Sequence, residues 1–353
     1  MSWSTRMWTV ASIELQQRVR GAAWYVLLGI FVFVVLVVTV FTTIATWNSE
    51  APGAVLYSLI VYFVLLLGTL VVPALSGNAI NGDREAGTLA TTQVTLVTTA
   101  QLVIGKLLAA WITALCFLVA ALPFLLFALV LGGASTASAV VSILVLALEL
   151  GVVSAVGVGL SGLVRRPLFS VVATYLVVAA LSIGTLIAFG LGGVVAQEQV
   201  TQRYEVVDWE ASSDEIDPQT GYPEQLVCTT VENTYTMPRF DRVWWVLAAN
   251  PYVLLADAVP THYDGFGNPD DLFGNIKFMV RQAQVPPEVP TWSECGRFDG
   301  APYPDAEEVI ASTVPSWVVG LLLHLVLAAG LIAGAISRTH APTRRMAAGS
   351  RVA

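Results

Sequence analysis

Hydrophobic residues in this chain gather into six long runs that are separated by more polar segments. Each run is long enough to cross about 30 Å of hydrocarbon as a helix that rises 1.5 Å per residue. The pattern predicts six transmembrane helices, with one carboxylate, Glu149, and one imidazole, His324, inside the membrane. The runs are residues 22–46, 53–77, 107–131, 139–164, 168–196 and 314–336.

The segments around these runs predict an all-α membrane protein with additional parts at both faces. Trp8, Ala11, Leu15 and Val19 are spaced as on one face of a helix, so we expect residues 1–21 to form an interfacial helix on the inner leaflet. The other expected parts are the first five membrane helices in 22–196, a loop-rich acidic external domain in 197–313, the sixth membrane helix in 314–337 and a basic tail in 338–353.

Charge predicts the orientation of the chain, because basic residues near helix ends stay on the cytoplasmic side. Six spans place both termini on one side, which holds eleven basic and three acidic residues. Residues 197–313, on the other side, hold 20 acidic and 6 basic residues. We therefore expect a multi-pass protein of the cytoplasmic membrane with both termini in the cytoplasm. The outer side has no basic patch of the kind that binds nucleic acid, and the sequence has no paired Cys and His spacing that suggests zinc.

Three features of the external segment predict local structure. Cys228 and Cys295 are its two cysteines, and an oxidising exterior favours a disulfide between them over two free thiols. Residues 244–259 are apolar and broken at Asn250-Pro251, which fits a re-entrant or interfacial segment or a helix buried in the external domain. The sequence DGFGNPDD, at 264–271, reads as an acidic turn rather than a calcium loop.

The most informative polar stretch follows the second run. Residues 79–100 begin with a tight charged cluster, Asp83, Arg84 and Glu85, before Gly87, Thr88 and Leu89. Acidic residues at the start of a short helix suit its dipole. A glycine then allows a sharp turn. We expect a short, rigid cytoplasmic projection joined to two membrane helices.

This stretch resembles the cytoplasmic loop in the permease subunits of type-2 ABC exporters, where an acidic-basic-acidic cluster, Gly-Thr and a Leu-rich stretch precede a Gly-Lys pair. Gly105 and Lys106 match that last pair. The layout of six spans, an N-terminal interfacial helix and an external insertion before the last span is also similar. The chain departs from the pattern in lacking a proline within 91–101.

The resemblance implies a non-enzymatic transporter subunit that exports an amphipathic or hydrophobic substrate. It implies coupling to a separate ATPase through Asp83, Arg84, Glu85, Gly87, Thr88 and Leu89. The expected partners are two ATPase copies, a second permease chain that is identical or different, and membrane lipid. ATP and Mg are expected on the ATPase, with no cofactor on this chain, since no G-x-x-x-x-G-K-[ST] loop occurs in it.

Two other functions are weighed against this one. An ion-coupled transporter would use Glu149, which lies at a depth similar to that of His324; the two side chains pair if the fourth and sixth spans touch, or each is bonded separately. An intramembrane serine protease is suggested by Gly159-Leu160-Ser161-Gly162 with His324. The expected depths, about 6 Å for the serine and about 21 Å for the histidine from the inner boundary, oppose a catalytic pair.

Overall fold

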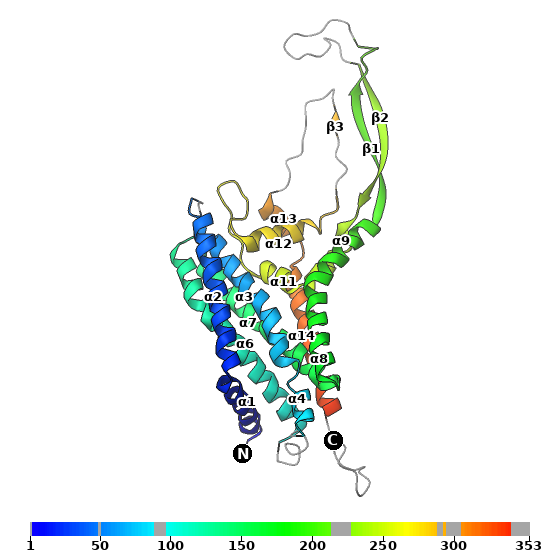
Figure 1. Cartoon of the computed structure of the whole chain (residues 1–353). Coiled ribbons are helices and arrows are strands. Elements are labelled where there is room, and N and C mark those ends of the chain that lie inside the picture. Colours follow the sequence, from blue (N-terminus) through cyan, green and yellow to red (C-terminus); the bar gives the residue numbers. More distant parts are fainter. Residues whose placement is uncertain are drawn as a thin grey trace. The chain divides into compact units, whose positions relative to one another are not determined.

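The computed structural model describes residues 2–48, 51–87, 97–212, 227–287, 292–293 and 305–339. Among these residues, six helical stretches are long and apolar enough to cross a membrane, which confirms the expectation of a multi-pass membrane protein. Figure 1 shows their arrangement. They are α2 (Ala22–Ala45), α3 (Pro52–Ser76), α6 (Thr99–Val130), α7 (Thr136–Leu163), the fifth span (Pro167–Val195) and α14 (Ser316–Thr339).

The N-terminal segment is helical, as expected. Helix α1 (Trp3–Arg20) begins after Ser2, whose side chain accepts the N–H of Thr5. It packs against the beginning of α6 at Gly105, where an added Cβ would lie 2.9 Å from the carbonyl oxygen of Met7. A side chain at position 105 would therefore push α1 away from the bundle.

Helix α6 begins eight residues before the apolar run that predicts it. Thr98 and Gln101 form a reciprocal capping box, in which each side chain accepts the other residue's backbone N–H. This cap satisfies N–H groups at the helix start and stabilises the polar first turns. As a result Lys106 lies inside the helix and does not open it.

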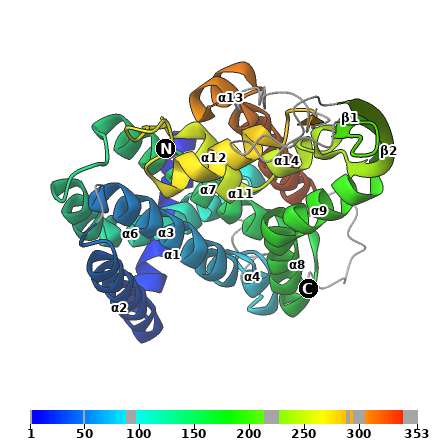
Figure 2. The ribbon, with the colours of Figure 1, turned by 90° about the horizontal axis from the view of Figure 1, so that it is seen from above.

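Helix α7 carries the small-residue face that lets neighbouring helices approach closely. A Cβ at Gly157 would lie 1.9 Å from Ser76 Oγ of α3, and one at Gly162 would lie 2.5 Å from Ala335 Cβ of α14. Helices α3 and α14 thus both pack against α7. In the view of Figure 2, α2 lies at the edge of the bundle, where it packs on α3 and α6.

The fifth span is helical throughout but changes its hydrogen-bond pattern in the middle. It consists of α8 (Pro167–Ala179), the π-helical turn η1 (Ala180–Gly184) and α9 (Thr185–Val195). Asn250 Nδ2 donates to Ser182 O at 2.6 Å and to Thr185 Oγ1 at 2.9 Å. A side chain from a different segment therefore donates a hydrogen bond to a carbonyl of the π turn.

The apolar segment 244–259 forms two short helices, α10 (Trp245–Ala248) and α11 (Pro251–Ala258). Asn250 caps α11 by accepting the N–H groups of Tyr252 and Val253, and Pro251 occupies the first turn. Helix α11 is almost fully buried and packs against α7 and α14. This packing on two spans agrees with a re-entrant or interfacial segment better than with a helix buried only in the external domain.

The contacts divide the chain into two units, and residues 247–277 belong to the unit that holds most of the spans. Residues 197–313 are therefore not one continuous domain. The first unit comprises 1–186, 247–277 and 315–353, and the second comprises 187–246 and 278–314. Helix α12 (Leu272–Gln282) begins in the first unit and ends in the second.

The second unit contains a three-stranded sheet, so an all-α description holds for the spans but not for the whole chain. Strands β1 (Gln197–Val207) and β2 (Cys228–Pro238) form an antiparallel ribbon, and β3 (Trp292–Ser293) pairs with β1 in parallel. Alternate residues such as Val200 and Tyr204 pair with Tyr235 and Val231, which gives the ribbon one apolar face. Helix α13 (Ala306–Ser312) and the short turn η2 (Phe240–Arg242) complete this unit.

Candidate functional site

The charged cluster after the second span forms a short helix, α4 (Asn81–Glu85), that is bonded to α7. Ser161 Oγ accepts the N–H groups of Ile80 at 2.9 Å and Asn81 at 3.1 Å. Asn81 Nδ2 donates to Val164 O at 2.6 Å. These bonds attach the start of α4 to the last turn of α7, whose carbonyls lack partners within their own helix.

The residues of α4 itself divide into internal and exposed groups. Arg84 donates to Asn81 Oδ1 at 2.9 Å and to Gly162 O at 3.1 Å, so its guanidinium holds α4 to α7. Glu85 is exposed, and Gly87 adopts a left-handed φ of 69°, which favours glycine. Thr88 and Leu89, the other two expected coupling residues, lie outside the described residues.

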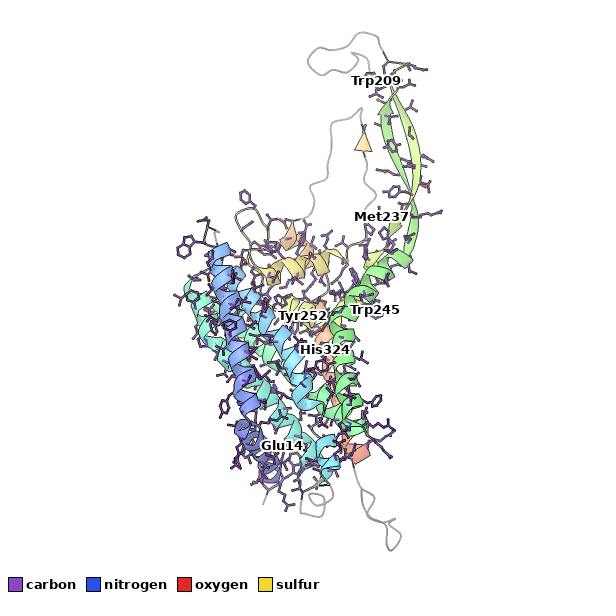
Figure 3. All side chains as sticks on the ribbon, in the orientation of Figure 1. Glu14, Trp209, Met237, Trp245, Tyr252 and His324 are labelled. Atoms are coloured by element: carbon purple, nitrogen blue, oxygen red, sulfur yellow. The ribbon has the colours of Figure 1, made fainter. Side chains whose placement is uncertain are left out.

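A buried lysine connects α4 with two other helices. Lys106 of α6 is 2% exposed and contacts Glu14 of α1 and, at 2.8 Å, Asp83 of α4. A buried charge is costly unless it is paired, and here one ammonium group faces two carboxylates that keep 19% and 28% of their exposure. We call Glu14, Lys106 and Asp83 the ion-pair cluster; Figure 3 shows Glu14 at the end of the bundle where α1 lies.

Arg18 adds a second connection between α1 and the bundle. Its guanidinium donates to Thr113 Oγ1 of α6 at 3.2 Å and to Leu75 O of α3 at 3.1 Å. Burial lowers the pKa of Arg18, and the nearby Glu14 carboxylate raises it in part. Helix α1 is thus joined by polar contacts to both α3 and α6, near the beginning of α4.

Glu149 and His324 pair with each other, which was one of the two alternatives predicted for them. Both Glu149 and His324 are 1% exposed, and His324 Nδ1 lies 3.0 Å from each carboxylate oxygen of Glu149. On the other side of the ring, Nε2 lies 2.9 Å from Ala249 O, in the break between α10 and α11. Figure 3 shows His324 inside the bundle near Tyr252 of α11. We call Glu149 and His324 the intramembrane pair.

The residues of the expected protease motif are kept apart. On α14, Leu331 packs against Gly159 and Ala335 packs against Gly162, so Ser161 lies at the level of these residues. His324 precedes Leu331 by two helical turns, roughly 10 Å along the axis. Ser161 Oγ accepts two N–H groups from the start of α4, while His324 contacts Glu149 and Ala249. A serine–histidine dyad needs a separation of about 3 Å.

The acidic turn at 264–271 is organised by its own backbone. Asp264 Oδ1 accepts the N–H groups of Phe266 and Asn268, and Gly267 has a φ of 82°. Asp271 Oδ1 accepts the N–H of Gly274 at the start of α12. Burial raises the pKa of Asp271 to about 6. Within the described residues, no group of three His, Cys, Asp or Glu side chains is placed to hold a metal ion.

The structure describes two of the three cysteines. Cys116 is a free, exposed thiol on α6, and Cys228 begins β2. Cys295 lies outside the described residues, so the Cys228–Cys295 disulfide stays a prediction.

Three contacts of the candidate site were not predicted from the sequence. Lys106 was matched to a Gly-Lys pair, but its two carboxylate partners were not foreseen; an isolated lysine within an otherwise apolar helix is the signal that predicts such partners. The contact of His324 with a backbone carbonyl leaves no signal in the sequence, because every residue has that group.

Comparison with models of known protein families and with curated protein sequences finds no match. The function of the chain is therefore inferred from its geometry and from the resemblance of its charged loop.

Proposed function

We propose that this chain is the membrane-spanning permease subunit of an ABC exporter and that α4 is the element through which an ATPase moves it. The observation that carries the proposal is the attachment of α4, which is bonded to α7 and, through Lys106, to α6 and α1, while Glu85 faces outward. A short helix held in this way transmits a push to several spans at once.

The contacts trace how such a push would spread. Displacement of α4 acts on the end of α7 through Ser161 and Val164, and on α6 and α1 through Lys106. Helix α7 in turn packs closely on α3 and α14 through its small-residue face. Packed helices move as rigid bodies rather than deform continuously. Motion at α4 would therefore reorient most of the bundle.

The remaining parts of the proposal follow from the resemblance and from charge. Two ATPase chains would bind ATP and Mg, and a second permease chain, identical or different, would complete the path for an amphipathic or hydrophobic substrate. The excess of basic residues beside the membrane ends of the helices favours termini in the cytoplasm, where an ATPase has its nucleotide. Outward transport is the direction of the family that the loop resembles.

Reversal of the exposed charge on α4 tests the proposal. Arg84 is unsuitable because it holds α4 to Gly162, whereas Glu85 is exposed. We expect Glu85→Arg to reduce stimulation of the co-purified ATPase by substrate up to about fivefold, since an exposed charge pair contributes up to about 1 kcal/mol. Glu307→Arg, at an exposed position of α13, is the matched control and should leave stimulation unchanged.

Transport by the purified chain alone, in vesicles without nucleotide, would overturn the proposal. So would full ATPase coupling by the Glu85→Arg variant when its amount in the membrane equals that of the unaltered chain.

An ion-coupled secondary transporter is the second candidate, and the intramembrane pair favours it. A carboxylate bonded to a histidine in a buried position is a common arrangement for carrying protons across a membrane. Transport that stops when the proton gradient is collapsed but continues with vanadate would favour this function over an ATP-driven one.

A further inference from the structure

The intramembrane pair joins three separate segments at one point. Glu149 comes from α7, His324 from α14, and the carbonyl of Ala249 from the break between α10 and α11. The break also packs directly on α14, because a Cβ at Gly320 would lie 2.1 Å from Ala248 O. The imidazole therefore links the short inserted helices to two membrane spans.

The hydrogen-bond partners determine how many protons this site holds. A carbonyl oxygen only accepts hydrogen bonds, so the contact of His324 Nε2 with Ala249 O requires a hydrogen on Nε2. An ionised carboxylate also only accepts, so the contact of Nδ1 with both oxygens of Glu149 requires a second hydrogen between them. The site thus contains two protons, one on Nε2 and one shared by His324 and Glu149, and its net charge is zero.

Loss of one proton is incompatible with keeping both contacts. A neutral imidazole has a single N–H, and the ionised Glu149 attracts it to Nδ1. The lone pair of Nε2 then faces the lone pairs of Ala249 O, and that contact becomes repulsive. If the hydrogen stays on Nε2 instead, the Nδ1 lone pair faces the carboxylate. The contact with the neutral carbonyl is the weaker of the two, so it is the one that is lost.

The other ionisable groups on the packed elements do not compete for this proton. In the described part of the chain, each has a different partner or is exposed. These groups are Tyr57 and Tyr62 of α3, Lys106 and Cys116 of α6, Tyr175 of α8, Tyr252 and Asp257 of α11, and Arg338 of α14.

We propose that Glu149 and His324 form a proton-binding site whose bound proton latches the α10–α11 break to α14, and that deprotonation releases the break. The site goes beyond the proposed export function and does not depend on it, because the latch consists of residues of this chain alone. After release, Asn250 and Asp257 still hold α11 through Ser182 and Ser316, so the change is confined to the break and the ends of the helices beside it.

Hydrogen exchange of the full chain in nanodiscs, without an ATPase, tests the latch. Protection factors of the peptide that covers 245–258 are compared at about pH 5 and about pH 9, which bracket the ordinary histidine pKa of about 6.5. Protection factors remove the intrinsic effect of pH on exchange. We expect protection to be about fivefold lower at the higher pH, since a hydrogen bond contributes on the order of 1 kcal/mol.

Two variants separate the latch from a merely structural contact. In Glu149→Gln, the amide N–H replaces the shared proton as the donor to Nδ1, Nε2 keeps its hydrogen, and protection should stay high at both pH values. In His324→Phe, no donor reaches Ala249 O, and protection should be low at both. Peptides of α3 report whether each variant is folded; if His324→Phe is not, Glu149→Gln alone decides.

Equal protection of the unaltered chain at both pH values would overturn the proposal. A pH dependence that persists unchanged in Glu149→Gln would also overturn it, since in that variant the contact of Nε2 with Ala249 O does not need the shared proton.

Discussion

Replacement of Lys106 by methionine tests the importance of the ion-pair cluster. Methionine has a similar length but no charge, so it leaves Glu14 and Asp83 facing each other at the end of the bundle. Removal of one partner from a buried ion pair costs about 3 to 5 kcal/mol. The two carboxylates keep 19% and 28% of their exposure and can be partly hydrated. We therefore expect a lower cost, about 2 to 3 kcal/mol.

The measurement is the free energy of unfolding in mixed micelles, with helix content as the signal. The triple variant Glu14→Gln, Asp83→Asn, Lys106→Met is the matched comparison, because it removes the three charges of the ion-pair cluster together. Replacement of a complete buried charge group by neutral residues is often neutral in stability. The triple variant should therefore recover most of the stability that Lys106→Met loses.

An unfolding free energy of Lys106→Met within 0.5 kcal/mol of that of the unaltered chain, on the order of a typical surface substitution, would refute this reasoning. A triple variant that is less stable than the single one would refute it as well, because packing of the lysine stem would then exceed the electrostatic effect.

Three further predictions concern the rest of the chain. Burial raises the pKa of Asp271 in the folded chain to about 6, above the ordinary value of about 3.9. The free energy of unfolding should therefore fall by about 2 kcal/mol as pH rises from about 4 to about 6. In unfolding measurements, Asp271→Asn should abolish that slope. Gly157→Ala, whose Cβ would lie 1.9 Å from a serine oxygen of α3, should cost about 1 to 3 kcal/mol, while Gly29→Ala, in open space on α2, should not destabilise. Cys228→Ser and Cys295→Ser should abolish the same shift between reduced and non-reduced gel mobility, and an unaltered shift in either would exclude the bridge.

Hydropathy predicts the spans because a membrane helix requires an apolar surface over its whole length. It predicts their ends less well, as α6 shows: its first turns are polar, and their stability comes from the capping box of Thr98 and Gln101. Hydropathy does not predict this cap, because the reciprocal bonds depend on the backbone conformation of both residues.

The β ribbon could be predicted only in part. The sequence at 203–210, RYEVVDWE, has strand character, yet β1 begins at Gln197 and pairs along its whole length with β2. Asn233, for example, is of a type that is depleted in strands, and its conformation is fixed by pairing with Gln202 on a partner strand that lies far along the chain.

For the candidate site, helical periodicity and depth were informative where both partners belong to spans. Glu149 and His324 were placed at similar depths, and they meet. The role of Arg84 was not predictable, since an exposed coupling residue and a residue bonded to Gly162 O have the same sequence signature. Tertiary context decides between them.

The ion-pair cluster also imposes an order on biosynthesis. Glu14 and Lys106 are separated by 92 residues, so their contact cannot close until the third span has left the ribosome. At about 5 to 20 residues per second, the N-terminal helix waits roughly 5 to 20 s after its own synthesis. During that interval its exposed Trp3 and Trp8 can rest on the lipid surface, and its final docking marks the arrival of the third span.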